Sequence, residues 1–224
     1  MTGPVPGSIP HRPRPPLETA EVAAVWDGHW PQASCPYALP EAWDMVVATI
    51  LADGTSAHRA RHLAAVLAEH LAGPRAYVDL QPRVLERFLV VVVDRRATVR
   101  ALIEAGRAIH LRHGGRVPSQ REDLVRLPGL GPRRGELVWA DHFQAPIITL
   151  TPAGAQAAAR FGWAENHVAA ARAALEERFP PAERRRRSHQ LAHCAAAWCR
   201  RQARCQRCPL AAACPSATVA DSQM

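Results

Sequence analysis

The sequence contains no lysine, because all 28 of its basic residues are arginine. An enzyme that forms a Schiff base with its substrate needs an amine, so no side chain of this protein can carry that chemistry. Long hydrophobic runs are also missing. No stretch approaches the ~18 uninterrupted apolar residues that span a bilayer, and we therefore expect no membrane segment.

Strand patterns are scarce as well. Only the run at 90–93, four valines, has the composition of a buried strand, and no second strand is visible to pair with it. We therefore assign this run to a buried helix. Elsewhere apolar residues recur at intervals of three and four, which predicts an all-α fold. The predicted helices are 41–52, 57–71, 83–92, 97–113, 120–127, 132–143, 153–161, 166–179 and 188–199.

The charge of the chain points to a polyanionic partner. At 224 residues with 48% hydrophobic content, the chain can bury one good core or two small ones. Its formal charge of +8 is spread along the sequence, which favours nucleic acid. No signal-peptide pattern is recognisable, so we expect a cytoplasmic protein with reduced thiols.

Four of the six cysteines lie near the C-terminus in the pattern C-x5-C-x2-C-x5-C: Cys199, Cys205, Cys208 and Cys214. Four thiolates in one short loop can bind an iron–sulfur cluster or a structural zinc ion. Two disulfides would suit a small secreted protein, which this chain does not resemble. We expect a phosphate backbone to contact the arginines between these cysteines, which are Arg200, Arg201, Arg204 and Arg207.

The segment 121–143 has the pattern of a helix–hairpin–helix motif. Ser119 and Glu122 predict a capping box for the first helix, and Pro132 suits the first turn of the second. An ordinary corner between two helices is the alternative. Free amides at the start of the second helix would bind phosphate oxygens without reading base sequence. The DNA contacts expected here are Gly129, Leu130, Gly131, Arg133 and Arg134.

The hairpin and the cysteine loop together resemble the endonuclease III family, helix–hairpin–helix DNA glycosylases that carry a [4Fe-4S] cluster. The resemblance runs from about Trp43 to Cys214 through HGGRVPSQREDLVRLPGLGPRRGELV, and the cysteine pattern is one residue shorter than the family's C-x6-C-x2-C-x5-C. It implies base flipping by a two-lobed protein, and it favours a [4Fe-4S] cluster over zinc. The implied parts are a disordered arm (1–16), a cluster domain (17–47 and 153–217), a six-helix domain (48–152) and a tail (218–224).

The residues that the family uses for chemistry differ in this sequence. The resemblance places Arg133 at the family's nucleophilic lysine and Thr151 at its assisting aspartate. Arginine stays protonated and offers no nucleophilic lone pair. Threonine has no carboxylate with which to stabilise a cationic sugar or activate water. We therefore predict that the family's glycosylase and lyase chemistry is lost or strongly altered.

Two segments that contact DNA in the family also differ. The resemblance places Gly54 where the family has the glutamine that fills the vacated base position, and Asp94 where it has an intercalating leucine. Phosphates repel a carboxylate, so Asp94 is a poor wedge. We expect Arg95 and Arg96 to contact DNA here, and a shift of one or two residues in the alignment would make one of them the wedge.

The sequence thus predicts a monomeric protein of the bacterial nucleoid that binds damaged or distorted double-stranded DNA in base excision repair. Two alternatives stay open. A monofunctional glycosylase would use a relocated carboxylate, with Asp53 the first candidate and Asp141 or Glu136 the others. An interaction module would instead dock a protein partner on the metal loop, and its binding would lack a steep salt dependence.

Overall fold

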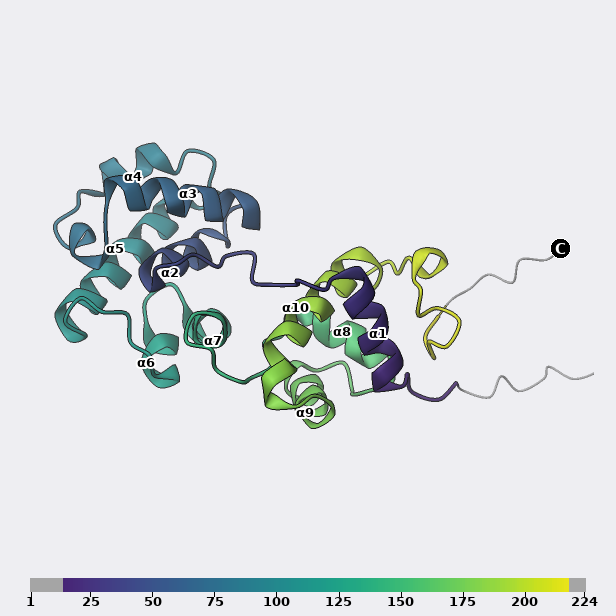
Figure 1. Ribbon diagram of the computed structural model, residues 1–224. Coiled ribbons are helices and arrows are strands. Elements are labelled where there is room, and N and C mark those ends of the chain that lie inside the picture. The colour runs from purple at the N-terminus through teal and green to yellow at the C-terminus, as the bar shows by residue number, and fades with distance from the viewer. Residues whose placement is uncertain (1–13, 218–224) are drawn as a thin grey trace, which may run out of the picture. The chain divides into compact units, whose positions relative to one another are not determined.

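A computed structural model describes residues 14–217 of the chain, and most of the predicted arm and tail lie outside this range. The described residues contain helices and no strands (Figure 1), which confirms the predicted all-α class. None of these helices is both long and apolar enough to cross a membrane. The described chain forms two compact units: the first comprises 14–31, 151–178 and 191–217, and the second 32–150 and 179–190.

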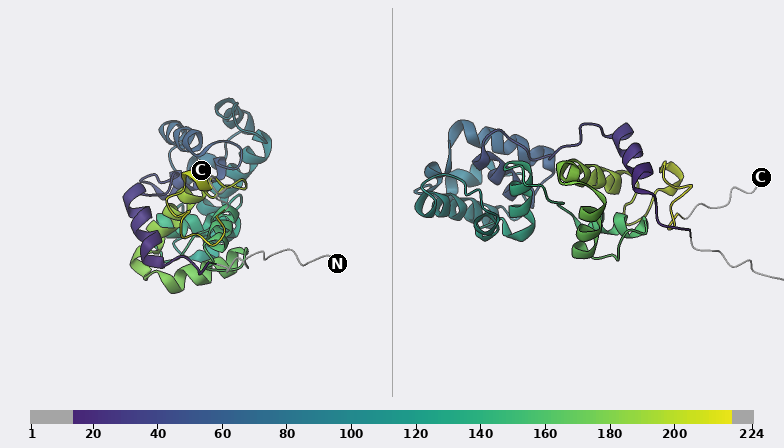
Figure 2. Two further views of the ribbon diagram at one scale, coloured as in Figure 1. Left: turned by 90° about the vertical axis from the view of Figure 1, so that its right-hand side faces the viewer. Right: turned by 60° about the horizontal axis from the view of Figure 1, so that its bottom comes forward.

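The second unit contains α2 to α7, coloured blue to teal in Figures 1 and 2, and is built around the 18-residue helix α5. Leu102 and Ile109 on the buried face of α5 are fully enclosed, because α2, α4 and the 3-10 helix η1 pack against that helix. Trp43 and Tyr77 meet edge to face in the same core, with ring centroids 4.9 Å apart. The elements are α2 (Ala42–Leu51), α3 (Ala57–His70), η1 (Pro74–Tyr77), α4 (Pro82–Phe88), α5 (Arg95–Arg112), α6 (Arg121–Arg126) and α7 (Gly131–Asp141).

The first unit has an aromatic core. Trp26, Phe161 and Trp163 are buried, with ring centroids 5.2 to 6.3 Å apart. The indole N–H of Trp163 donates a hydrogen bond of 2.7 Å to the carbonyl of Leu17, which ties the N-terminal segment to this core. The elements are α1 (Thr19–His29), α8 (Pro152–Arg160), α9 (Val168–Arg178), the end of α10 (Pro181–Ala197) and the 3-10 helix η2 (Cys205–Arg207).

The valine run differs from the prediction. Helix α4 ends at Phe88, and residues 90–94 form turns with Val90, Val91 and Val93 exposed, so the expected buried helix is wrong there. Only Val92 turns inward. Four consecutive valines cannot all face a core across a turn this short, and apolar composition alone does not reveal that.

Four further features differ from those predicted. Helix α10 begins at Pro181, seven residues before the predicted start, and so includes the run of four arginines at 184–187. The N-cap of α6 is Gln120 and makes no side-chain hydrogen bond, so the capping box predicted from Ser119 and Glu122 does not form.

Arg14, expected in the disordered arm, donates hydrogen bonds to carbonyls near the C-terminus. Segments 32–47 and 179–190, assigned to the cluster domain from sequence, pack within the second unit.

Candidate nucleic-acid interface

Helices α6 and α7 form the predicted hairpin, and two glycines make its turn. Gly129 and Gly131 have φ angles of +78° and +63°, a conformation that residues with a Cβ rarely adopt. A Cβ on Gly129 would lie 2.9 Å from the Cβ of Ala101 and 3.2 Å from Ile50. Leu130 between them is buried and anchors the turn in the core.

A third glycine, not singled out in the sequence, sets how closely the two hairpin helices approach. A Cβ on Gly135 of α7 would lie 2.8 Å from the Cα and N of Val125 and 2.9 Å from the carbonyl carbon of Leu124. All three are backbone atoms of α6, which cannot rotate away as a side chain can. The backbones of α6 and α7 therefore meet at Gly135, and this contact fixes the shape of the hairpin.

The start of α7 is open to an anion. Its N-cap, Leu130, provides no side-chain acceptor, so the first amides of α7 have none of the capping bonds that usually satisfy them. Arg133 in the first turn is exposed. Burial raises the pKa of the half-buried Tyr37, and the positive charge of Arg133 partly offsets this rise. Tyr37 gave no signal in the sequence, because it comes from a segment 96 positions upstream of Arg133.

The turn between α4 and α5 presents apolar side chains beside arginines. Val90, Val91 and Val93 are 65%, 51% and 69% exposed. The turn is fixed from behind by Gly54, whose carbonyl accepts a 2.9 Å hydrogen bond from the amide of Val93. A Cβ on Gly54 would lie 2.4 Å from the carbonyl oxygen of Val93, so only glycine fits there. Asp94 ends the turn in the left-handed conformation, with φ +52°, and α5 follows with Arg95 and Arg96.

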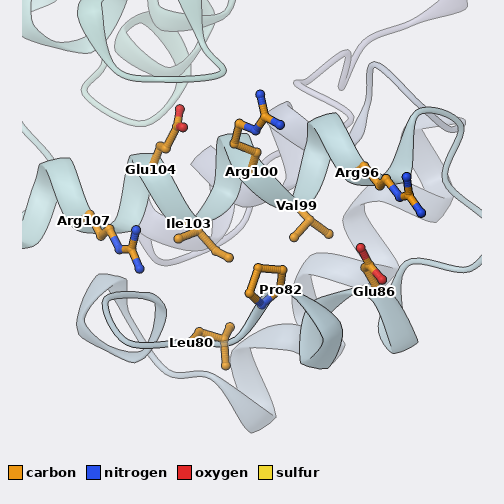
Figure 3. A pocket seen from close by; sticks show the side chains of 9 residues that line it. All are labelled: Leu80, Pro82, Glu86, Arg96, Val99, Arg100, Ile103, Glu104 and Arg107. Carbon is orange, nitrogen blue, oxygen red and sulfur yellow. The ribbon is translucent and has the colours of Figure 1, made fainter.

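Between α4 and α5 lies an open groove of about 320 Å³, shown in Figure 3. Val99 and Ile103 point from α5 towards Pro82 and Leu80, and together they form an apolar floor. Charged side chains border this floor on both sides: Arg96, Arg100, Arg107, Glu86 and Glu104. Since both signs of charge are present, the groove adds little net charge to the arginines at the start of α5.

The cysteine loop follows α10 in the first unit. All six cysteines of the chain are free thiols. Burial raises the pKa of Cys208, and the other three thiols of the pattern raise it further. The four thiols are therefore close enough to influence one another electrostatically. Within residues 14–217, no three Cys, His, Asp or Glu side chains converge closely enough to hold a single metal ion. The four arginines of the loop, 200, 201, 204 and 207, are exposed.

A fifth cysteine lies beside the loop. Cys194 donates a hydrogen bond to Cys199, and this bond, together with the guanidinium of Arg160, lowers the pKa of Cys199. Cys194 is fully buried, whereas Cys205 and Cys208 are partly accessible. The contact with Arg160 was not predicted from the sequence.

Several known proteins are similar to this chain in sequence or in fold. No family model matches the chain. Endonuclease III of Bacillus subtilis (strain 168) is 23% identical over 189 residues, 83% of this chain and 86% of that protein. Endonuclease III of Thermotoga maritima is 23% identical over 124 residues, 55% of this chain and 58% of that protein. A solved non-covalent endonuclease III–DNA complex superposes with a TM-score of 0.80 at 21% identity, covering 90% of this chain and 97% of that one.

The chain has the endonuclease III fold. A thermostable thymine-DNA glycosylase is also similar, with a TM-score of 0.75 at 17% identity over 88% of this chain and 94% of that one. The resemblance to the endonuclease III family that was inferred from the hairpin and the cysteines is thereby confirmed. The roles of individual residues stay predictions.

The resemblance places two residues, Arg133 and Thr151, at the catalytic positions of endonuclease III, and the structure shows where each of them lies. Thr151 is the N-cap of α8, and its hydroxyl accepts a 3.1 Å hydrogen bond from the amide of Gly154. Arg133 belongs to the second unit and Thr151 to the first. The hydroxyl of Thr151 therefore caps a helix, and the guanidinium of Arg133 lies at the open start of α7.

The relocated carboxylate proposed first, Asp53, forms an ion pair with Arg134. Asp53 is half exposed and lies in the turn after α2, and Arg134 also donates a 3.0 Å hydrogen bond to the carbonyl of Leu130. The pair joins that turn to the hairpin. It occupies one of the two arginines expected to contact phosphate, so Arg133 is the more available cation of the two.

The other two carboxylates are buried, and each contacts a basic side chain. Glu136 accepts a 3.0 Å hydrogen bond from Nε of Arg121, which joins α7 to the start of α6. Asp141 lies 2.6 Å from Nε2 of His189 on α10, with both side chains buried. Burial raises the pKa of the neighbouring thiol, Cys35, and the carboxylate of Asp141 raises it further. In these surroundings both carboxylates hold helices together.

Proposed function

We propose that this protein binds damaged or distorted double-stranded DNA in the manner of an endonuclease III-type repair protein, without Schiff-base chemistry. The observation that carries the proposal is the hairpin at 121–143, which presents the uncapped start of α7 and the exposed Arg133 within an endonuclease III fold. Backbone amides at a helix start bind phosphate oxygens of any sequence, and a guanidinium beside them adds charge. Both features serve binding and require no lysine.

The exposed valines support a specific mode of binding. Aliphatic side chains that insert between base steps unstack them and kink the duplex, and arginines nearby hold the flanking phosphates. Val90, Val91 and Val93 are exposed apolar side chains, separated from Arg95 and Arg96 by Asp94 alone. We propose that this turn is the wedge, in place of Arg95 or Arg96, the candidates that the sequence left open. A distorted duplex, already partly unstacked, would accept the wedge at lower cost than an intact one.

We further propose that Cys199, Cys205, Cys208 and Cys214 hold a [4Fe-4S] cluster. A tetrahedral zinc with Zn–S bonds of about 2.3 Å brings its sulfurs to about 3.8 Å from one another. Each iron of a [4Fe-4S] cluster takes one thiolate, so the sulfurs lie farther apart. The four thiols act on one another electrostatically at Cys208, which supports a shared metal centre, and the resemblance to endonuclease III favours the cluster over zinc. When bound, the cluster would cross-link the loop and supply one-electron redox chemistry. Its presence would make the purified protein brown, with a broad absorbance near ~400 nm, whereas zinc would leave it colourless.

The proposal is tested by fluorescence anisotropy on matched intact, mismatched and abasic duplexes over a range of salt concentrations. We expect tighter binding to the abasic duplex and a steep fall of log affinity with log salt. Replacing Arg204 or Arg207 by alanine should reduce that slope by about 1 each, because each arginine displaces about one counterion. Arg75→Ala is the matched control, since its charge is already paired with Asp79 at 3.0 Å.

The wedge has its own test in the same assay. The triple variant Val90→Ser, Val91→Ser, Val93→Ser should lose preference for the abasic duplex and keep its affinity for the intact one. Val84→Ser on α4, an exposed valine outside the turn, should change neither. Absence of DNA binding, or binding that does not respond to salt, would contradict the proposed function and favour a protein partner for the arginine-rich loop.

A further inference from the structure

One residue contacts both ends of the cysteine pattern. The guanidinium of Arg160, the last residue of α8, donates hydrogen bonds to the carbonyls of Cys199 at 2.9 Å, Arg200 at 2.6 Å and Arg201 at 3.2 Å. Its own backbone carbonyl accepts a 3.5 Å hydrogen bond from the Sγ of Cys214. The partners lie 39 to 54 positions away in the sequence.

These contacts have a clear physical origin. Helix α10 ends at Ala197, so the carbonyls just beyond it have no helical amide to accept from and carry partial negative charge. A planar guanidinium has several donors in a fixed fork and can serve neighbouring carbonyls at once. Arg160 is therefore suited to hold the first turn of the loop in one conformation.

A second arginine braces the other end of the loop. Arg14 donates hydrogen bonds to the carbonyls of Ala211 at 3.4 Å and Cys214 at 3.2 Å. These contacts involve only the last part of the pattern. The side chain of Arg160 instead serves the first part of the pattern and places its charge beside Cys199.

We propose that Arg160 is the positioning residue of the cysteine loop, holding the backbone at Cys199, Arg200 and Arg201 in the conformation that the bound cluster requires and favouring the reduced state of that cluster by its charge. This inference rests on the proposed cluster. Two effects follow from two properties of the side chain. The fork of hydrogen bonds governs how firmly the cluster is retained, and the charge governs its reduction potential, because a nearby cation stabilises the added electron.

The test compares the wild-type protein with Arg160→Gln, Arg160→Lys and Arg178→Gln, all purified without oxygen. Arg178 is the matched control: it lies in the same unit, donates to the carbonyl of Ala174 at 3.0 Å and lies over the ring of Trp163 at 5.4 Å, so its contacts are with its own helix and the aromatic core. Three quantities are measured: iron per chain, the rate at which a chelator removes iron, and the midpoint potential by spectroelectrochemical titration.

We expect Arg160→Gln to lose iron to the chelator at least tenfold faster than the wild type, and its remaining cluster to have a more negative midpoint potential. Arg160→Lys should keep the wild-type potential and still lose iron faster, since lysine lacks the two-nitrogen fork with which Arg160 contacts the three carbonyls. Arg178→Gln should match the wild type in both. The lysine variant keeps the test decisive if the glutamine variant does not fold.

Iron retention and potential equal to the wild type in both Arg160 variants would overturn the inference. An unchanged potential in Arg160→Gln would also overturn it, because a merely structural brace predicts that result. A wild-type protein without iron would instead refute the proposed cluster, and the iron assay on the wild type separates that failure from a failure of Arg160.

Discussion

The closest backbone contact in the hairpin gives a sharp mutational prediction, Gly135→Ala. The new methyl group would lie 2.8 Å from the Cα and N of Val125, well inside van der Waals contact. Because these are backbone atoms of α6, the strain can be relieved only by moving one helix away from the other. Overpacking of this kind costs about 2 kcal/mol, which corresponds to a fall of about 4–8 °C in Tm for a chain of this length.

The assay pairs thermal unfolding, followed by circular dichroism, with anisotropy on an abasic duplex. We expect Gly135→Ala to unfold at lower temperature and to bind more weakly even well below its Tm, because the separated helices misplace the start of α7. Gly28→Ala is the control: it also replaces a helical glycine, nothing lies within 4 Å of its Cβ, and it should be neutral or slightly stabilising. A Gly135→Ala protein with wild-type Tm and affinity would refute the account of the hairpin.

Three further variants test other contacts. Arg121→Ala removes the guanidinium partner of buried Glu136 and should lower the free energy of unfolding by about 2 kcal/mol in urea denaturation, whereas the exposed Arg126→Ala should not; equal losses would contradict the pairing. His189→Ala leaves the buried Asp141 carboxylate without its imidazole and should cost about 3 kcal/mol, and a loss below about 1 kcal/mol would show that the pair is dispensable. Gly54→Ala places a methyl group 2.4 Å from the carbonyl oxygen of Val93; it should displace the valine turn and reduce the preference for abasic over intact DNA, and an unchanged preference in the anisotropy assay would argue against the wedge.

Local patterns in the sequence predicted much of the fold. Helices predicted at 41–52 and 57–71 are observed at Ala42–Leu51 and Ala57–His70, because apolar periodicity is a property of neighbouring residues. The tight turn at Gly129 and Gly131 is confirmed by their positive φ angles. Apolar periodicity and turn glycines can both be recognised within a few consecutive residues.

Contacts between distant segments were beyond the reach of the sequence. The exposure of Val90, Val91 and Val93 depends on the fit of Val92 and Val93 against Gly54, about 40 positions earlier. A run of valines has the same composition whether it is buried or exposed, so the prediction of a buried helix there was wrong.

In the candidate site, too, local motifs could be predicted from the sequence and contacts between distant residues could not. The motif located the hairpin and the cysteines, but the partners of the proposed carboxylates lie far along the chain: 81 positions separate Asp53 from Arg134 and 48 separate Asp141 from His189. Arg160 was one of 28 arginines with nothing local to distinguish it. Pairing between side chains of common types leaves no mark on the sequence of either partner.

We propose that the protein uses its endonuclease III fold to bind DNA and lacks an amine nucleophile at its hairpin. Borohydride reduction on an abasic duplex tests this most directly, with the wild type and Arg133→Lys side by side. We predict that the wild type shifts the duplex in a gel but gives no covalent adduct, and that Arg133→Lys, which restores an amine at that position, gives one. A borohydride-trapped adduct with the wild-type protein would contradict the claim.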